Sequence, residues 1–163
     1  IETGVMQGDP TPILVANAYA FGARNYDPRT LLRTMRYGAE VPGANSQGVL
    51  TRLGLEQYLE KGYYDASILL EYTSSDFAIG RFALQACNDE PVCNWYTLRA
   101  LNWKTLFNQE TGCLQSRNEV ASSTRYAADR RETINQNYFR TVLYYLPVSL
   151  SHIRGKAAAD RLL

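Results

Sequence analysis

The sequence is poor in the residues that build metal centres and disulfide scaffolds. Its 163 residues include three cysteines, Cys87, Cys93 and Cys113, and a single histidine, His152. So few cysteines, odd in number, exclude a disulfide-dense fold. One histidine far along the chain from every cysteine excludes a zinc cluster, so no metal ligands are expected. Cys87 and Cys93 either close a small loop or remain reduced, and the sequence leaves both alternatives open.

Strong net charge and long apolar runs are also missing. The 17 basic and 16 acidic side chains give a formal charge of +1, which is too weak for a nucleic-acid surface, so no nucleic-acid partner is expected. Uncharged runs such as residues 11–23 fall well short of the roughly 20 residues of a membrane helix, so no membrane partner is expected. The chain opens on Ile1 in mid-pattern, without Met or a signal-like leader, which predicts a fragment.

The charge divides unevenly along the chain. Residues 1–119 carry 10 basic and 13 acidic side chains, a net charge of −3, whereas residues 120–163 carry 7 and 3, a net charge of +4. A change of sign of this kind predicts a domain boundary near residue 120. Beyond the boundary, a helix is expected from Ser122 or Ser123 to Leu146.

Helical spacing of apolar residues dominates the first part. The helices expected from caps, Pro and Gly signals cover residues 11–21, 28–41, 55–61, 66–86 and 91–107. Asp27 and Asp65 precede two of them as N-cap residues. The last helix shows an amphipathic aromatic stripe that predicts either core packing or a sugar-stacking platform; its members are Trp95, Leu98, Arg99, Asn102, Trp103 and Leu106. No convincing strand alternation precedes residue 112, so an all-α fold of antiparallel helices is predicted.

Carboxylates are the main candidates for chemistry, because no Walker loop or dinucleotide fingerprint is present. Asp9 precedes the first helix, where it acts either as an N-cap or as an exposed, rigidly held substrate ligand. Glu71 and Asp76 share the longest helix, but five residues rotate about 140° around a helix, so the two do not form an acid–base pair. Glu71 lies in an apolar run and is expected to be a buried hydrogen-bonding or binding residue.

Short sequence pieces follow one another in a specific order along residues 1–119. They are GVMQGDP at 4–10 with 13–22, RLGLEQY at 52–58, KGYY at 61–64, LEYTSSDFAI at 70–79, RALNW at 99–103 and LFNQETGCLQSRN at 106–118. Each piece is weak alone, but their order and spacing together resemble the opening of the catalytic domain in family-92 glycoside hydrolases. Residues 120–163 are expected to be a divergent helical tail without family motifs.

This resemblance implies a calcium-dependent, inverting exo-α-mannosidase that trims mannose from N-glycans and related mannosides. It implies an all-α fold, a partial (α/α)6 helical barrel or toroid, which in the family follows a β-sandwich domain that this chain lacks. It also implies a secreted or extracytoplasmic location. The family's catalytic acid and base and most calcium ligands lie in downstream motifs that do not occur in this sequence. The chain is therefore expected to contain no catalytic residue and no metal ligand, and to be inactive alone.

The resemblance also assigns candidate binding residues. Asp9 stands where the family presents a substrate-binding carboxylate, and Arg52 stands where an arginine contacts sugar hydroxyls. Glu71 and Asp76 are expected on the inner wall of the barrel. Two alternatives remain: a non-enzymatic all-helical binding or scaffold module, and a peptide-N-glycanase-related protein of N-glycoprotein processing. No cysteine here has the His and Asp neighbours that such an amidase needs.

Overall fold

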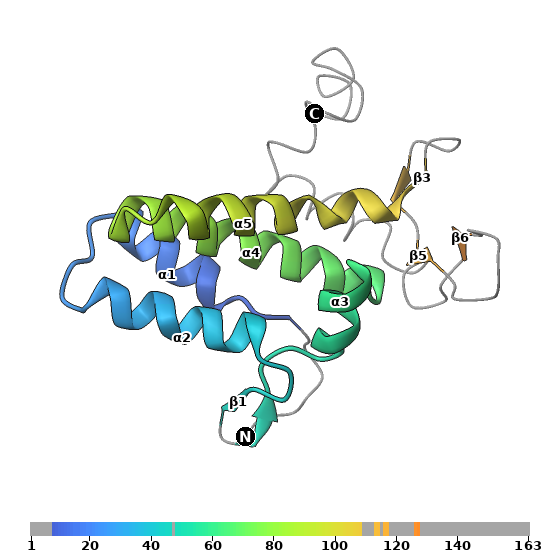
Figure 1. Ribbon diagram of the computed structural model, residues 1–163, viewed down its shortest axis with the longest axis horizontal. Coiled ribbons are helices and arrows are strands. Elements are labelled where there is room, and N and C mark those ends of the chain that lie inside the picture. The colour runs from blue at the N-terminus through green and yellow to red at the C-terminus, as the bar shows by residue number, and fades with distance from the viewer. Residues whose placement is uncertain (1–7, 47, 109–112, 115, 118–125, 128–163) are drawn as a thin grey trace, which may run out of the picture. The chain divides into compact units, whose positions relative to one another are not determined.

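Helices make up most of the computed structural model, which describes residues 8–46, 48–108, 113–114, 116–117 and 126–127 (Figure 1). The chain divides into two units, residues 1–105 and 106–163. The helices are α1 (Thr11–Ala20), α2 (Pro28–Glu40), α3 (Leu55–Lys61), α4 (Ala66–Cys87), α5 (Glu90–Ala100) and the 3-10 helix η1 (Leu101–Leu106). The all-α fold predicted from the sequence is confirmed.

Side-chain caps explain where three of these helices begin. The Asp27 carboxylate accepts hydrogen bonds from the backbone N–H groups of Arg29 and Thr30 at the start of α2. The Asp65 carboxylate accepts from the N–H of Ser67 at the start of α4, and Asp89 caps α5 in the same way. Each cap satisfies N–H groups that have no partner within the helix. The predicted caps Asp27 and Asp65 are confirmed.

Short hairpins interrupt the helical pattern. Strands β1 (Asn45–Ser46) and β2 (Val49–Leu50) pair antiparallel, so the prediction that no strand precedes residue 112 is wrong at this point. Two residues a strand give too little alternation to be seen in a sequence. In the second unit, β3 (Phe107–Asn108) pairs with β4 (Cys113–Leu114), and β5 (Ser116–Arg117) pairs with β6 (Tyr126–Ala127). Of the helix predicted from Ser122 or Ser123 to Leu146, the structure describes only residues 126–127, which form strand β6 and are not helical; the rest lies outside the described residues.

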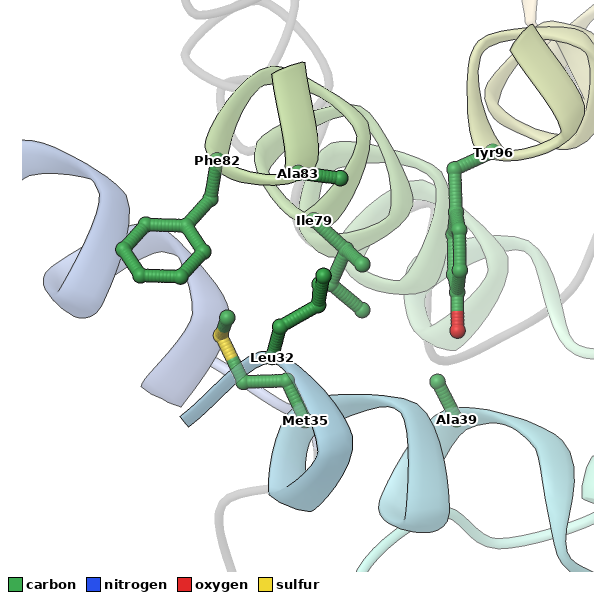
Figure 2. Packing of buried hydrophobic residues seen from close by; sticks show 7 residues of the cluster. All are labelled: Leu32, Met35, Ala39, Ile79, Phe82, Ala83 and Tyr96. Atoms are coloured by element: carbon green, nitrogen blue, oxygen red, sulfur yellow. The ribbon is translucent and has the colours of Figure 1, made fainter. Parts of the chain in front are cut away.

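The core of the first unit forms around α4, which packs against α1, α2 and α5 (Figure 1). Figure 2 shows side chains from α2 facing side chains from α4, with an aromatic ring from α5 beside them; the cluster consists of Leu32, Met35, Ala39, Ile79, Phe82, Ala83 and Tyr96. Burial of each large apolar side chain contributes about 1.5–3 kcal/mol. Ile79 and Tyr96 lie about one helical turn from Asp76 and Arg99, so this packing also fixes those two polar residues.

The exposed face of α5 differs from the predicted stripe. Trp95 and Leu98 are 46% and 68% exposed, whereas Cys93, Tyr96 and Ala100 are buried. The alternative of core packing is therefore wrong for Trp95 and Leu98, whereas it holds for Arg99, Trp103 and Leu106 of the same stripe, which are buried. With 3.6 residues per turn, adjacent residues lie about 100° apart, so a spacing pattern alone does not decide which neighbouring residue faces the core. Here the ring of Tyr96 turns inward.

The structure also bears on the state of the cysteines and on membrane-spanning helices. Cys87 and Cys93 are free thiols, which favours the reduced alternative. No helix in the described part of the chain combines the length and the apolar character that a membrane crossing requires.

Candidate functional site

Four charged side chains meet beneath the surface of the first unit, and we call them the buried charge cluster: Asp9, Arg52, Asp76 and Arg99. They come from the segment before α1, the segment before α3, the middle of α4 and the end of α5. Their residue exposures are between 0% and 8%. Two carboxylates and two guanidinium groups balance in charge, which is the condition under which buried ions are tolerated.

Asp76 is the hub of the cluster. Its Oδ1 accepts hydrogen bonds from Arg52 Nη1 at 2.8 Å and from Arg99 Nη2 at 2.6 Å. Its Oδ2 accepts from Arg99 Nε at 2.6 Å and from the Tyr58 hydroxyl at 2.7 Å. Four donors on one carboxylate, two of them from a bidentate arginine, satisfy a group that is fully buried.

Asp9 lies at one end of the cluster. Its Oδ2 accepts a hydrogen bond from Arg52 Nε at 2.9 Å, and its backbone oxygen accepts one from the Ser75 hydroxyl. Asp9 does not cap α1, because Pro10 is the N-cap residue and no side chain makes a capping bond there. It is also 5% exposed, so the expectation of an exposed carboxylate is wrong. Burial raises the pKa of Asp9 above its ordinary value, and the neighbouring Arg52 offsets only part of that rise.

Arg52 connects the two carboxylates. Burial lowers the pKa of its guanidinium group, but the attraction of Asp76 and Asp9 outweighs burial, so the pKa is raised and the group stays charged. The guanidinium carbon lies 4.9 Å from the centre of the Tyr72 ring. Tyr72 also donates from its hydroxyl to the backbone oxygen of Leu53 at 2.9 Å, which ties this segment to α4. The Nη2 atom of Arg52 is buried and has no hydrogen-bond partner among the described residues.

Aromatic rings enclose the other arginine. The guanidinium carbon of Arg99 lies 4.6 Å from the centre of the Trp95 ring and 4.5 Å from that of Tyr96. Burial raises the pKa of the Tyr58 hydroxyl, and Asp76 beside it acts in the same direction, so the hydroxyl remains a proton donor to Asp76. Sequence reasoning did not identify Arg99 and Tyr58 as members of the site. The signal for Arg99 was an arginine within the amphipathic aromatic stripe of its helix.

Of the four binding residues predicted from the sequence, three lie in the buried charge cluster and one lies beside it. Asp9, Arg52 and Asp76 are joined by ion pairs in one cluster. Glu71 is half-buried and lies beside Gly8, where a Cβ atom added to the glycine would meet Glu71 Cγ at 3.3 Å. Because Gly8 precedes Asp9, Glu71 lies at the edge of the same region.

The donor set of the cluster does not fit a calcium ion. Calcium takes six to eight oxygen ligands, and within the described ranges no group of three or more His, Cys, Asp or Glu side chains could hold a metal. Asp9 and Asp76 are moreover each bonded to arginine. No step of the chemistry is therefore assigned to a metal held by these residues.

Comparison with known proteins places this helical unit in a family. Residues 1–145 match the family model for the glycosyl hydrolase family 92 catalytic domain. That match continues past the boundary predicted near residue 120, which itself remains a prediction. No curated protein matches the chain.

Two solved structures from Bacteroides thetaiotaomicron have a similar fold. A family GH92 inverting mannosidase is 24% identical, with a TM-score of 0.66, over 78% of this chain and 18% of that chain. A family GH92 α-mannosidase in complex with mannoimidazole is 22% identical, with a TM-score of 0.64, over 78% of this chain and 16% of that chain. The chain thus spans less than a fifth of the length of these two proteins. On the family match and the shared fold, the chain belongs to glycosyl hydrolase family 92 and corresponds to part of its catalytic domain.

Proposed function

We propose that this chain is part of an inverting exo-α-mannosidase and that it contributes binding of the mannose ring rather than bond cleavage. Membership in family 92 and the fold shared with two mannosidases support a mannosidase. The proposed substrate is a mannose-containing glycan such as an N-glycan. In the longer protein, calcium would be held by residues outside the described part of this chain, and secretion would bring the enzyme to its glycan.

One observation supports the binding role most strongly, namely the unpaired donor of Arg52. A buried guanidinium nitrogen without a partner is costly, and native proteins keep such groups mainly where a ligand or another polar group completes the bond. Arg52 Nε is bonded to Asp9, so the two residues together offer a donor beside a carboxylate. Sugar hydroxyls both donate and accept hydrogen bonds and therefore suit this pairing.

The same geometry argues against turnover by this chain alone. Inverting glycosidases need a carboxylic acid to protonate the leaving oxygen and a free carboxylate about 6.5–9.5 Å away to activate water. Asp9 and Asp76 are instead ion-paired to the same arginine, Arg52. A buried carboxylate in such a pair is poorly suited to accept a proton from water. We therefore place the acid and the base in other parts of the full-length protein.

The binding test is an NMR titration of the complete chain with methyl α-D-mannoside. We expect saturable binding that weakens about tenfold or more in Asp9→Asn, because a hydrogen bond to a charged group is worth about 1.5–3 kcal/mol. The matched control is Asp27→Asn, an exposed N-cap residue whose amide oxygen still caps α2. Equal affinities for the wild type and Asp9→Asn would contradict the assignment of Asp9.

The absence of turnover has a separate test. Incubation of the chain with α-1,2-mannobiose and calcium should release no mannose. Release that stops on chelation would show that the chain carries its own acid and base, contrary to the proposal. Absence of any mannoside binding would instead favour the alternative of a non-enzymatic scaffold module.

A further inference from the structure

We propose that Arg99 is a positioning residue, which acts through Asp76 to aim the free Nη2 donor of Arg52. The inference rests on the proposed sugar-binding role of Arg52. Arg99 itself is covered by the rings of Trp95 and Tyr96, so it is not offered as a ligand to the sugar. Its contribution lies in the geometry that it imposes on its neighbours.

The first step is the bidentate hydrogen bonding of Arg99 to Asp76. Arg99 Nε and Nη2 donate to the two different oxygens of the carboxylate, each at 2.6 Å. Two parallel bonds between planar groups fix the rotation of the carboxylate as well as its position. Arg99 is itself fixed, because its Nη1 donates to the backbone oxygen of Ala39 in α2 at 3.0 Å.

The second step is the transfer of this orientation to Arg52. Arg52 Nη1 donates to Asp76 Oδ1 at 2.8 Å, and Arg52 Nε donates to Asp9 Oδ2 at 2.9 Å. Two nitrogens held by two carboxylates define the plane of the guanidinium group. The direction of the remaining nitrogen, Nη2, is then determined, and it is the nitrogen without a partner among the described residues.

Lysine is the informative replacement for Arg99. It keeps the positive charge but presents a single ammonium group in place of the planar fork. In Arg99→Lys the carboxylate of Asp76 gains rotational freedom, and Arg52 loses its fixed orientation. A purely structural role for Arg99 would lower stability without changing Arg52 in the molecules that remain folded.

The experiment uses the complete chain with 15N-labelled arginine and two readouts. The first is the Nε–Hε NMR signal of Arg52, assigned by its loss in Arg52→Lys. The second is the dissociation constant for methyl α-D-mannoside. The variants are Arg99→Lys and the control Arg81→Lys, which replaces an exposed arginine on the same helix as Asp76. Tyr58→Phe removes one hydroxyl donor to Asp76 without altering any charge and serves if Arg99→Lys does not fold.

The positioning role predicts that Arg99→Lys shifts the Arg52 signal and weakens mannoside binding about fivefold, as expected for one impaired hydrogen bond. Arg81→Lys should change neither, and Tyr58→Phe should shift the signal in part. An unchanged Arg52 signal in Arg99→Lys would overturn the proposal. If Arg99→Lys does not fold, an unchanged Arg52 signal in Tyr58→Phe would overturn it instead. If the wild type binds no mannoside but the Arg52 signal still shifts, the positioning role holds and the proposed sugar-binding function fails.

Discussion

Replacement of Asp76 by asparagine should be the most damaging small change in this chain. The substitution keeps the shape of the side chain but removes its negative charge. The buried charge cluster then holds two guanidinium groups against the single carboxylate of Asp9. The new amide also presents an N–H₂ group where the carboxylate accepted two hydrogen bonds on each oxygen.

The magnitude follows from burial. Asp76 has 0% side-chain exposure, so water cannot solvate the charge that is left unpaired. Removal of one partner from a buried ion pair costs about 3–5 kcal/mol. This is a large part of the roughly 5–15 kcal/mol that stabilises a typical domain. With a urea dependence of about 2 kcal/mol per molar, the unfolding midpoint should fall by about 2 M.

The assay is urea unfolding of the complete chain, followed by far-UV circular dichroism of its helices. Glu60→Gln is the matched control, because it neutralises an exposed carboxylate on α3. Surface changes of this kind usually remain within about 0.5 kcal/mol. An Asp76→Asn midpoint close to that of Glu60→Gln would show that Asp76 is not the charged hub of the cluster.

Three further predictions address other parts of the fold. Burial raises the pKa of Asp9 in the folded chain above its ordinary value of 3.8. The protonated side chain therefore stabilises the fold below pH 3.8, and this stabilisation is lost as the pH rises through the raised pKa of the folded chain. The wild type should therefore gain stability relative to Asp9→Asn on acidification, and parallel urea midpoints across the acid range would contradict this. Gly54→Ala should lower the free energy of thermal unfolding by about 1–3 kcal/mol, because Gly54 has a φ of 61° and the added Cβ would lie 2.2 Å from the Tyr64 ring. Gly43→Ala should lower this free energy by less, because Gly43 has a φ of 81° but open space around the added Cβ. Asp27→Ala should lower the free energy of urea unfolding by about 1 kcal/mol, and no change would show that the α2 cap contributes nothing.

Local signals in the sequence predicted most of the helices. Asp65 before an apolar stripe and Asn88 after it bound α4, because a cap and a left-handed turn act within a few residues. The inward face of α5 could not be derived in the same way. Whether Trp95 or Tyr96 turns inward depends on the surfaces of α2 and α4, which are brought together only in the tertiary structure.

The candidate site was predictable residue by residue but not as an assembly. Asp9, Arg52 and Asp76 stood out through family-like motifs, yet nothing in their spacing showed that Arg52 bridges the two carboxylates. The exposure of Asp9 also differs from expectation, since a carboxylate before a helix usually caps it in solvent. Asp9 instead turns inward because Arg52 offers a buried partner.

In the proposed binding mode, Arg52 is held by Asp9 and Asp76 and presents a donor to a mannose hydroxyl. A crystal structure of the chain soaked with methyl α-D-mannoside tests it most directly, through the distance from Arg52 Nη2 to the nearest sugar oxygen. We expect a hydrogen bond of about 2.7–3.2 Å, with Asp9 beside the same ring. A sugar bound elsewhere, with Arg52 Nη2 bonded to a protein atom, would contradict it.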